Sequence, residues 1–330
     1  MTSEGALTLT LELEAGCVAD VHVSSTRRTD YSAALAGRAV DEALHLVPSL
    51  FSICATAHAV AALRACERAL GVEVDAEQRR LRELLCQLEA LDNHAFQVSV
   101  GWAKQAGVAP DVEPLRRLRH ATETLRVWAH AGARWVRLGG IGFTPRGSVD
   151  ALLAELSDAV DAVAPPAARQ GDARALEAWS AQAAGPVAAL FRQVFSLGAA
   201  GFGKSTLPLV PALDAAWFEA RLTGPDFGAR PTLDAGAAES GALARAAHHP
   251  AVAALVGAHG HAVLPRLVAA LVDLRALADA VASVASALAR SPGHAHAERD
   301  SGSGAGVADT SRGARRCWCW RSTRACRAAW

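Results

Sequence analysis

Residues 50–67 have the sequence LFSICATAHAVAALRACE, and this stretch decides the interpretation of the whole chain. From Ile53 to Leu70 the apolar residues recur at steps of three and four, and Gly71 follows the last of them. This spacing predicts an amphipathic helix that ends before the glycine. Cys54 and His58 are four residues apart at its start, so the spacing places them on one face of the first turn.

A cysteine at the start of a helix combines a sulfur ligand with the positive end of the helix dipole. Cys54 is therefore a candidate metal ligand or nucleophile, with His58 one turn later beside it. The structural alternative is a small buried thiol next to a core histidine with satisfied hydrogen bonds, and spacing alone favours this alternative. Arg64 and Glu67, further along the same helix, are expected to pair on its surface.

The rest of the chain is predicted to be mainly helical. Before the decisive stretch, alternation of apolar and polar residues over 7–13 and 18–23, around Ala15-Gly16, predicts a β-hairpin. After it, Asp75 is expected to cap a long helix that runs to about Gln105. Further helices are predicted over 115–131, 148–163, 241–255 and 263–290, and Pro250 is expected to kink or split the helix over 241–255. No alternation of strands and helices calls for a parallel sheet.

The composition excludes several classes of protein. Half of the residues are hydrophobic (51%), so the chain is not intrinsically disordered. Lys+Arg and Asp+Glu both number 33, and this zero net charge argues against a nucleic-acid partner. No signal peptide and no apolar run of about 18 residues is evident, which predicts a cytoplasmic protein without a membrane partner. The first four of the seven cysteines show no C-x-x-C spacing and are expected to be free thiols.

One domain is expected over 1–313, with loop-rich connections at 163–186 and 198–236. The sequence after it, ARRCWCWRSTRACRAAW at 314–330, differs abruptly in composition. GC-rich codons for Leu-Leu-Val-Leu, shifted by one base, encode Cys-Trp-Cys-Trp. The tail is therefore hypothesised to be the product of a frameshift. A tail that binds metal through its C-x-C, or one that lies on a membrane surface, is the alternative, but the tail offers only three thiols and no nearby histidine.

Residues 198–205, GAAGFGKS, match the phosphate-binding pattern G-x-x-x-x-G-K-[ST]. Such a loop wraps phosphates with backbone N–H groups and lies between a strand and a helix. Here residues 187–197 fit a helix as well as a strand, and prolines at 208 and 211 would break a helix after the loop. A glycine-rich connection is therefore favoured. The phosphate-binding residues of the alternative are Gly198, Gly203, Lys204 and Ser205.

The stretch 50–67 resembles the first metal-binding motif of nickel–iron hydrogenase large subunits, R-x-C-G-x-C-x-x-x-H-A-x-A-x-x-R-A-x-E. Other segments of the chain follow in the order of that family. They are the N-terminal hairpin, Gly37-Arg38, Gly71-Val72-Glu73, Asn93-His94, Gly139-Gly140, the run ESGALAR at 239–245, and the glycine-rich segment that ends in Arg312-Gly313. The resemblance extends in patches from about residue 7 to 313. It implies that family's mainly α fold, with a long-helix core and an N-terminal β-hairpin.

The departures from the motif bear on activity. With His58 aligned, Cys54 takes the place of the second cysteine, whereas Phe51 replaces the first, Ser52 the glycine and Ser49 the arginine. The family's later D-P-C-x-x-C is missing from the sequence. A nickel–iron centre bridged by four thiolates cannot be built from Cys54 alone, so no nickel and no hydrogenase activity are expected.

A large-subunit relative without these ligands resembles the hydrogenase expression/formation accessory proteins of the HupK/HoxV type. The resemblance implies a non-catalytic scaffold or chaperone that holds an iron–cyanide–carbonyl fragment and passes it to the hydrogenase large subunit precursor. A HypC-like chaperone and a HypD-type maturation protein are the other implied partners. Cys54 is then the candidate iron ligand, His58 orients the fragment, and His94 is expected near the same pocket or, alternatively, in the core. A nucleotide-binding protein and a metal-free interaction module stay open as alternatives.

Overall fold

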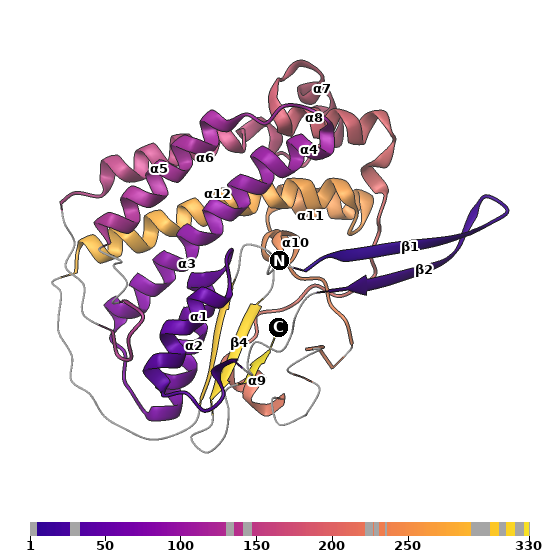
Figure 1. The fold of residues 1–330 in the computed structure, drawn as a ribbon. Coiled ribbons are helices and arrows are strands. Elements are labelled where there is room, and N and C mark those ends of the chain that lie inside the picture. Colours follow the sequence, from indigo (N-terminus) through magenta and orange to yellow (C-terminus); the bar gives the residue numbers. More distant parts are fainter. Residues whose placement is uncertain are drawn as a thin grey trace.

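The computed structural model describes residues 5–26, 34–129, 135–140, 147–221, 227, 231–234 and 236–291, and the backbone of three C-terminal strands. The described chain begins with a β-hairpin and continues as a predominantly helical body (Figure 1). The mainly α architecture with an N-terminal hairpin, expected from the sequence, is confirmed.

The N-terminal elements follow the predicted order. Gly71 ends the second helix with a left-handed φ of 65°, which glycine adopts without a steric penalty. The Asp75 side chain caps the third helix by accepting a hydrogen bond of 2.6 Å from the Gln78 amide. These elements are β1 (Leu7–Glu14), β2 (Cys17–Ser25), α1 (Val40–Leu50), α2 (Ala55–Leu70) and α3 (Ala76–Phe96).

The predicted long helix is present and contains an irregular turn. After α3 comes a π-helical segment, η2 (Gln97–Gly101), and then α4 (Trp102–Ala106). Gly107 ends α4 with a φ of 69°. A π-helical turn inside an α-helix shifts the direction of the side chains that follow it.

The second half of the chain is richer in helix than the sequence predicted. The connection 163–186, expected to be a loop, contains a ten-residue helix capped by Asp172, whose carboxylate accepts from the Arg174 and Ala175 amides. Pro250 splits the predicted helix over 241–255 as expected. The elements are α5 (Val112–Trp128), α6 (Asp150–Val163), η4 (Pro166–Ala168), α7 (Ala173–Gln182), α8 (Gly185–Ser196), η5 (Ala199–Gly201), α9 (Ala215–Arg221), α10 (Ala242–Ala246), α11 (Pro250–His259) and α12 (Val263–Ala289).

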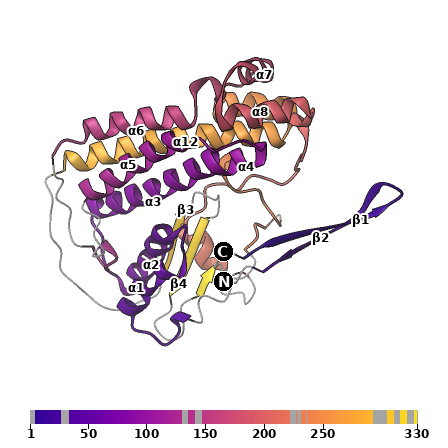
Figure 2. The same cartoon turned by 45° about the horizontal axis from the view of Figure 1, so that its top comes forward.

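The core has two parts. The larger part lies between α3, α5, α6, α8 and α12, and α12 runs through its middle (Figures 1 and 2). The smaller part lies between α1 and α2. Since α2 is rich in alanine and buried on nearly all sides, its neighbours approach its backbone closely. These neighbours include α1, α3 and the C-terminal strands, so the start of α2 is held from several directions.

The C-terminal strands β3 (Gly304–Asp309), β4 (Arg315–Trp320) and β5 (Arg327–Ala329) form an antiparallel sheet in that order. The backbones of β3 and β4 lie against α2. The atypical tail thus supplies two strands of this sheet, and its origin in a frameshift stays a hypothesis. Among the described residues, no helix is long and apolar enough to cross a membrane.

Candidate functional site

Cys54 is the residue that precedes the first turn of α2. Its side chain is partly exposed, forms no disulfide and makes no capping hydrogen bond to the helix. The carbonyl oxygen of Cys54 accepts from the His58 amide at 3.1 Å and lies 2.8 Å from the His58 ring nitrogen Nδ1. Because a carbonyl can only accept, Nδ1 of the His58 ring carries a proton. The structure therefore couples the two residues through one backbone oxygen.

Phe51 fixes the plane of the His58 ring. The two rings are stacked with centroids 3.5 Å apart and an interplanar angle of 7°. Both side chains are buried, with exposed fractions of 7% for Phe51 and 2% for His58. In the alignment that the resemblance implies, Phe51 takes the place of the motif's first cysteine, and its aromatic ring carries no metal donor.

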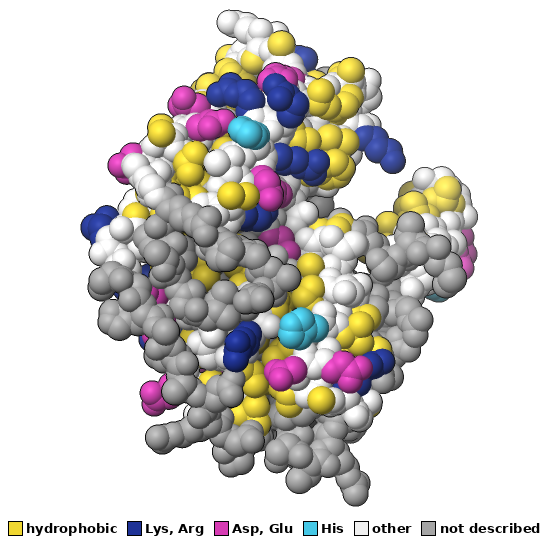
Figure 3. Space-filling model, turned by 60° about the vertical axis from the view of Figure 1, so that its left-hand side comes forward, with side chains coloured by type: hydrophobic (Ala, Val, Ile, Leu, Met, Phe, Trp, Pro, Cys, Tyr) yellow, Lys and Arg dark blue, Asp and Glu magenta, His cyan; other side chains and the backbone are white. Residues whose placement is uncertain are grey.

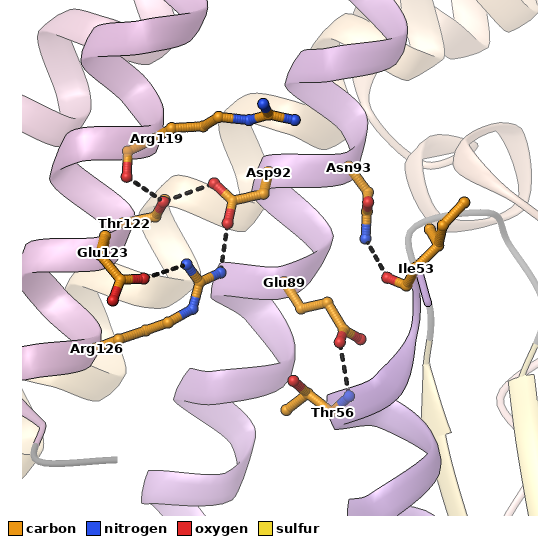
Figure 4. A network of polar contacts seen from close by, with 9 residues as sticks. All are labelled: Ile53, Thr56, Glu89, Asp92, Asn93, Arg119, Thr122, Glu123 and Arg126. Atoms are coloured by element: carbon orange, nitrogen blue, oxygen red, sulfur yellow. Dashed lines mark hydrogen bonds and ion pairs between the residues drawn. The ribbon is translucent and has the colours of Figure 1, made fainter. Parts of the chain in front are cut away.

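The sequence analysis missed Glu89 of α3, which binds the first turn of α2. Its carboxylate accepts hydrogen bonds from the amides of Thr56 at 2.6 Å and Ala57 at 3.1 Å (Figure 4). Burial raises the pKa of Glu89 above its usual value, and the two amides and the Arg126 charge oppose that rise. The carboxylate, rather than the thiol of Cys54, thus meets the positive end of α2. The sequence offered one sign of this role, because Glu89 is a charged residue placed directly after Leu88 within the leucine-rich part of the helix.

Asn93 holds the residue before Cys54. Its side-chain amide donates a hydrogen bond of 2.7 Å to the carbonyl oxygen of Ile53. Asn93 lies one helical turn after Glu89, so both side chains project from the same face of α3 towards the start of α2 (Figure 4). Two side chains of α3 thereby fix the backbone on both sides of Cys54.

A polar network anchors this part of α3 to α5. Asp92 forms an ion pair with Arg126 and accepts a hydrogen bond of 2.6 Å from the Thr122 hydroxyl (Figure 4). Arg126 also contacts Glu123 at 3.2 Å. The side chains that position Cys54 therefore come from a helix that is itself held in place.

His94 contacts a different set of residues. Its Nδ1 lies 3.5 Å from the Asp273 carboxylate of α12, and its Nε2 lies 3.5 Å from the Arg245 guanidinium of α10. Arg245 and Asp273 form a bidentate ion pair with N···O distances of 2.9 and 2.7 Å. These contacts favour the alternative of a core histidine in a buried ionic cluster.

The expected surface pair of Arg64 and Glu67 is wrong. Glu67 is 4% exposed and forms a bidentate ion pair with Arg82 of α3, with both N···O distances at 2.7 Å. Its carboxylate also accepts from the Gly139 amide at 3.0 Å. Glu67 thus joins the end of α2 to α3 and to the Gly139 turn.

The segment 198–205 does not have the context of a phosphate-binding loop. Helix α8 precedes it in place of a strand, and residues 202–214, all of them described, contain no helix. The Ser205 amide donates to the His261 carbonyl at 3.2 Å, and the Gly203 carbonyl accepts from Arg266 at 2.7 Å. Gly198, Gly203, Lys204 and Ser205 therefore belong to a connection that docks on the start of α12.

The described side chains offer few metal ligands around Cys54. Within the part of the chain that the structure describes, the one group of three potential ligand atoms close together is Glu12, Asp20 and His22 of the hairpin. Burial and the nearby carboxylates of Glu67 and Asp41 raise the pKa of Cys66 to about 12, so this thiol stays protonated. Among the residues whose side chains the structure describes, the one thiol of Cys54 and the one imidazole of His58 fit a single contact to a soft metal fragment.

Comparison with known proteins finds partial similarity to hydrogenases and to hydrogenase expression/formation proteins. No protein-family model matches the chain. It is 31% identical over 117 residues to a vhu subunit of the F420-non-reducing hydrogenase of Methanocaldococcus jannaschii, covering 36% of this chain and 28% of that protein. It is 35% identical over 99 residues to the hydrogenase expression/formation protein HupV of Azotobacter chroococcum, covering 30% of this chain and 29% of that protein. It is 30% identical over 185 residues to the hydrogenase expression/formation protein HupK of Azotobacter vinelandii, covering 55% of this chain and 51% of that protein.

The matched segments thus span about half, or less, of the length of these relatives. Among solved structures, the chain superposes on the Ni-Fe-Se hydrogenase of Desulfomicrobium baculatum with a TM-score of 0.63 at 16% identity, covering 99% of this chain and 87% of the other. Identity this low shows the fold alone. Over part of its length the chain is therefore similar to hydrogenase expression/formation proteins, and it has the fold of nickel–iron hydrogenase large subunits.

Proposed function

We propose that the chain is a non-catalytic accessory protein of nickel–iron hydrogenase maturation that acts in the cytoplasm. Partial similarity to proteins named for hydrogenase expression and formation supports this role. The main observation in favour of a non-catalytic role is that the Phe51 ring stacks on the His58 ring. An aromatic ring fills the place of a metal-binding cysteine and is packed there, so the first ligand pair of a hydrogenase is reduced to Cys54.

The cargo in this proposal is an iron–cyanide–carbonyl fragment held by the thiolate of Cys54. The His58 ring, whose Nδ1 is engaged by the Cys54 carbonyl, orients the fragment by contact beside the thiol. Glu89 and Asn93 fix the backbone on either side of the thiol. These residues bind and position the cargo, and no bond-making step needs them.

A single thiolate suits a carrier better than a permanent site. Four bridging thiolates hold a metal centre tightly, whereas one contact is released when a thiolate of the acceptor displaces it. The acceptor in the proposal is the hydrogenase large subunit precursor. A HypC-like chaperone and a HypD-type maturation protein supply the fragment. The shared fold supports this partnership, because a large-subunit-like surface can present the cargo to proteins that recognise the large subunit.

The test is infrared spectroscopy of the protein purified after co-expression with the maturation proteins. The proposal predicts cyanide and carbonyl bands that are lost in Cys54→Ala and retained in Cys66→Ala, whose thiol is buried on the same helix. Circular dichroism confirms that both variants are folded. Bands that survive in Cys54→Ala contradict the assignment of Cys54.

The same preparations distinguish the remaining alternatives. A metal-free interaction module shows no bands and binds the maturation proteins equally well with and without Cys54. A nucleotide-binding protein binds ATP, and the binding is lost in Lys204→Ala.

A further inference from the structure

The N-terminal hairpin has a continuous apolar face that the described chain leaves uncovered. Four leucines of β1 alternate with polar residues and are 55 to 73% exposed, and three valines of β2 are 46 to 64% exposed. The strand register places Leu9 opposite Val23, Leu11 opposite Val21 and Leu13 opposite Val18. We call these seven side chains the hairpin apolar face: Leu7, Leu9, Leu11, Leu13, Val18, Val21 and Val23.

This exposure is unusual for a folded chain in water. The hairpin extends away from the helical body, and in the space-filling view it stands clear of the body at the right-hand edge with hydrophobic side chains on its surface (Figures 1 and 3). A two-stranded ribbon is at best marginally stable in water and needs a second layer against its apolar side. Contiguous apolar patches of several hundred Å² mark interaction sites. The hairpin therefore presents a candidate interaction surface.

We propose that the hairpin apolar face packs against the same face of a second copy, giving a symmetric dimer. Seven aliphatic side chains at these exposures present on the order of 700 Å², close to the roughly 800 Å² that each partner contributes to an interface of standard size. A two-fold axis through the centre of the face brings leucines and valines of one copy onto those of the other. Two ribbons of the same twist can pack face to face in this way.

The charges of the hairpin agree with this arrangement. The polar side of the ribbon carries Glu12, Asp20 and His22, and the His22 ring lies 3.1 Å from Glu12 and 3.5 Å from Asp20. In the proposed dimer these groups point away from the interface, so two acidic surfaces are not brought together. Pairing through a strand edge would instead leave the apolar face exposed to water. Face-to-face packing is the arrangement that covers it.

The experiment is sedimentation equilibrium of the full chain over a range of concentrations. The unaltered protein is expected to be a dimer at micromolar concentration. The double substitution Leu9→Lys/Leu11→Lys is expected to weaken dimerisation more than about a hundredfold, because each lost leucine counts in both copies. The matched control Thr8→Lys/Thr10→Lys adds the same charges on the polar side and is expected to leave the dimer intact.

A second pair of variants keeps the test independent of folding. Leu11→Lys and Leu11→Glu chains are each expected to be monomeric, and mixing them is expected to restore a dimer through opposite charges near the axis. A monomer at every concentration for the unaltered chain, or a dimer that survives Leu9→Lys/Leu11→Lys, overturns the proposal. Neither result bears on the maturation role, which rests on Cys54.

Discussion

The two ends of α2 are both joined to α3 by a carboxylate, but in different ways. At the end of the helix, Glu67 is buried and forms a bidentate ion pair with Arg82. At the start, Glu89 accepts from the backbone amides of Thr56 and Ala57 and also interacts with the Thr56 side chain. The first arrangement fixes the helix by pairing charges. The second holds the backbone of the first turn, from which the side chains of Cys54 and His58 project.

The cysteines of α2 give the largest expected contrast between its two ends. At pH 8 a thiol with the pKa of Cys66, about 12, is thiolate in about one molecule in ten thousand. Cys54, at the partly exposed start, is therefore expected to react with iodoacetamide more than about a thousandfold faster than Cys66. Mass spectrometry of the labelled peptides gives both rates in one sample. Equal rates in the folded protein would remove the contrast.

The ion pair at the end of α2 should dominate stability. Arg82→Met leaves the Glu67 carboxylate buried without its partner, and the expected loss is about 3–5 kcal/mol of unfolding free energy. Urea denaturation followed by circular dichroism measures it. The control Arg68→Met removes an exposed ion pair with Glu219 and is expected to cost less than about 1 kcal/mol. Similar losses of unfolding free energy in the two variants would show that the buried ion pair contributes no more to stability than the exposed one.

The start of α2 should respond more weakly to the loss of a tether. Asn93→Ala removes the hydrogen bond to the Ile53 carbonyl, at an expected cost of about 1 kcal/mol. The same denaturation experiment measures this loss. Labelling of Cys54 is expected to change as well, because the backbone before it is released. A variant with unchanged stability and unchanged labelling would exclude Asn93 as a tether.

The smallest effect is a pH dependence at Glu89. Its pKa is raised in the folded state, so the folded protein binds this proton more tightly than the unfolded chain. The resulting stabilisation is fully present below the unfolded pKa, near 4.5, and is lost as the pH rises through the folded pKa. The stability of the unaltered protein relative to Glu89→Gln is therefore expected to increase from pH 7 to pH 5. Urea titrations of both proteins at several pH values test the direction of this change. A stability difference that stays the same at every pH would refute it.

The sequence predicted those elements whose signals are local. The period of α2, the Gly71 stop, the Asp75 cap and the split at Pro250 each depend on residues within one or two turns, and all are present. Helix α7 was missed because prolines and glycines surround it, although Asp172 was a visible cap.

The site could be predicted only in part, because its partners are distant in sequence. Cys54 and His58 share one turn, so their proximity followed from spacing. Glu89 and Asn93 reach the same turn from α3, more than thirty residues away, and only the packing of the two helices brings them there. Glu67 was misplaced for the same reason, since its partner Arg82 lies on a different helix.

The central claim is that Cys54 provides a single thiolate for an iron fragment. X-ray absorption at the iron edge, on protein purified after co-expression with the maturation proteins, counts the sulfur neighbours of iron. The account predicts one sulfur neighbour, lost in Cys54→Ala and retained in Cys66→Ala. Two or more sulfur neighbours, or one that persists in Cys54→Ala, would contradict it.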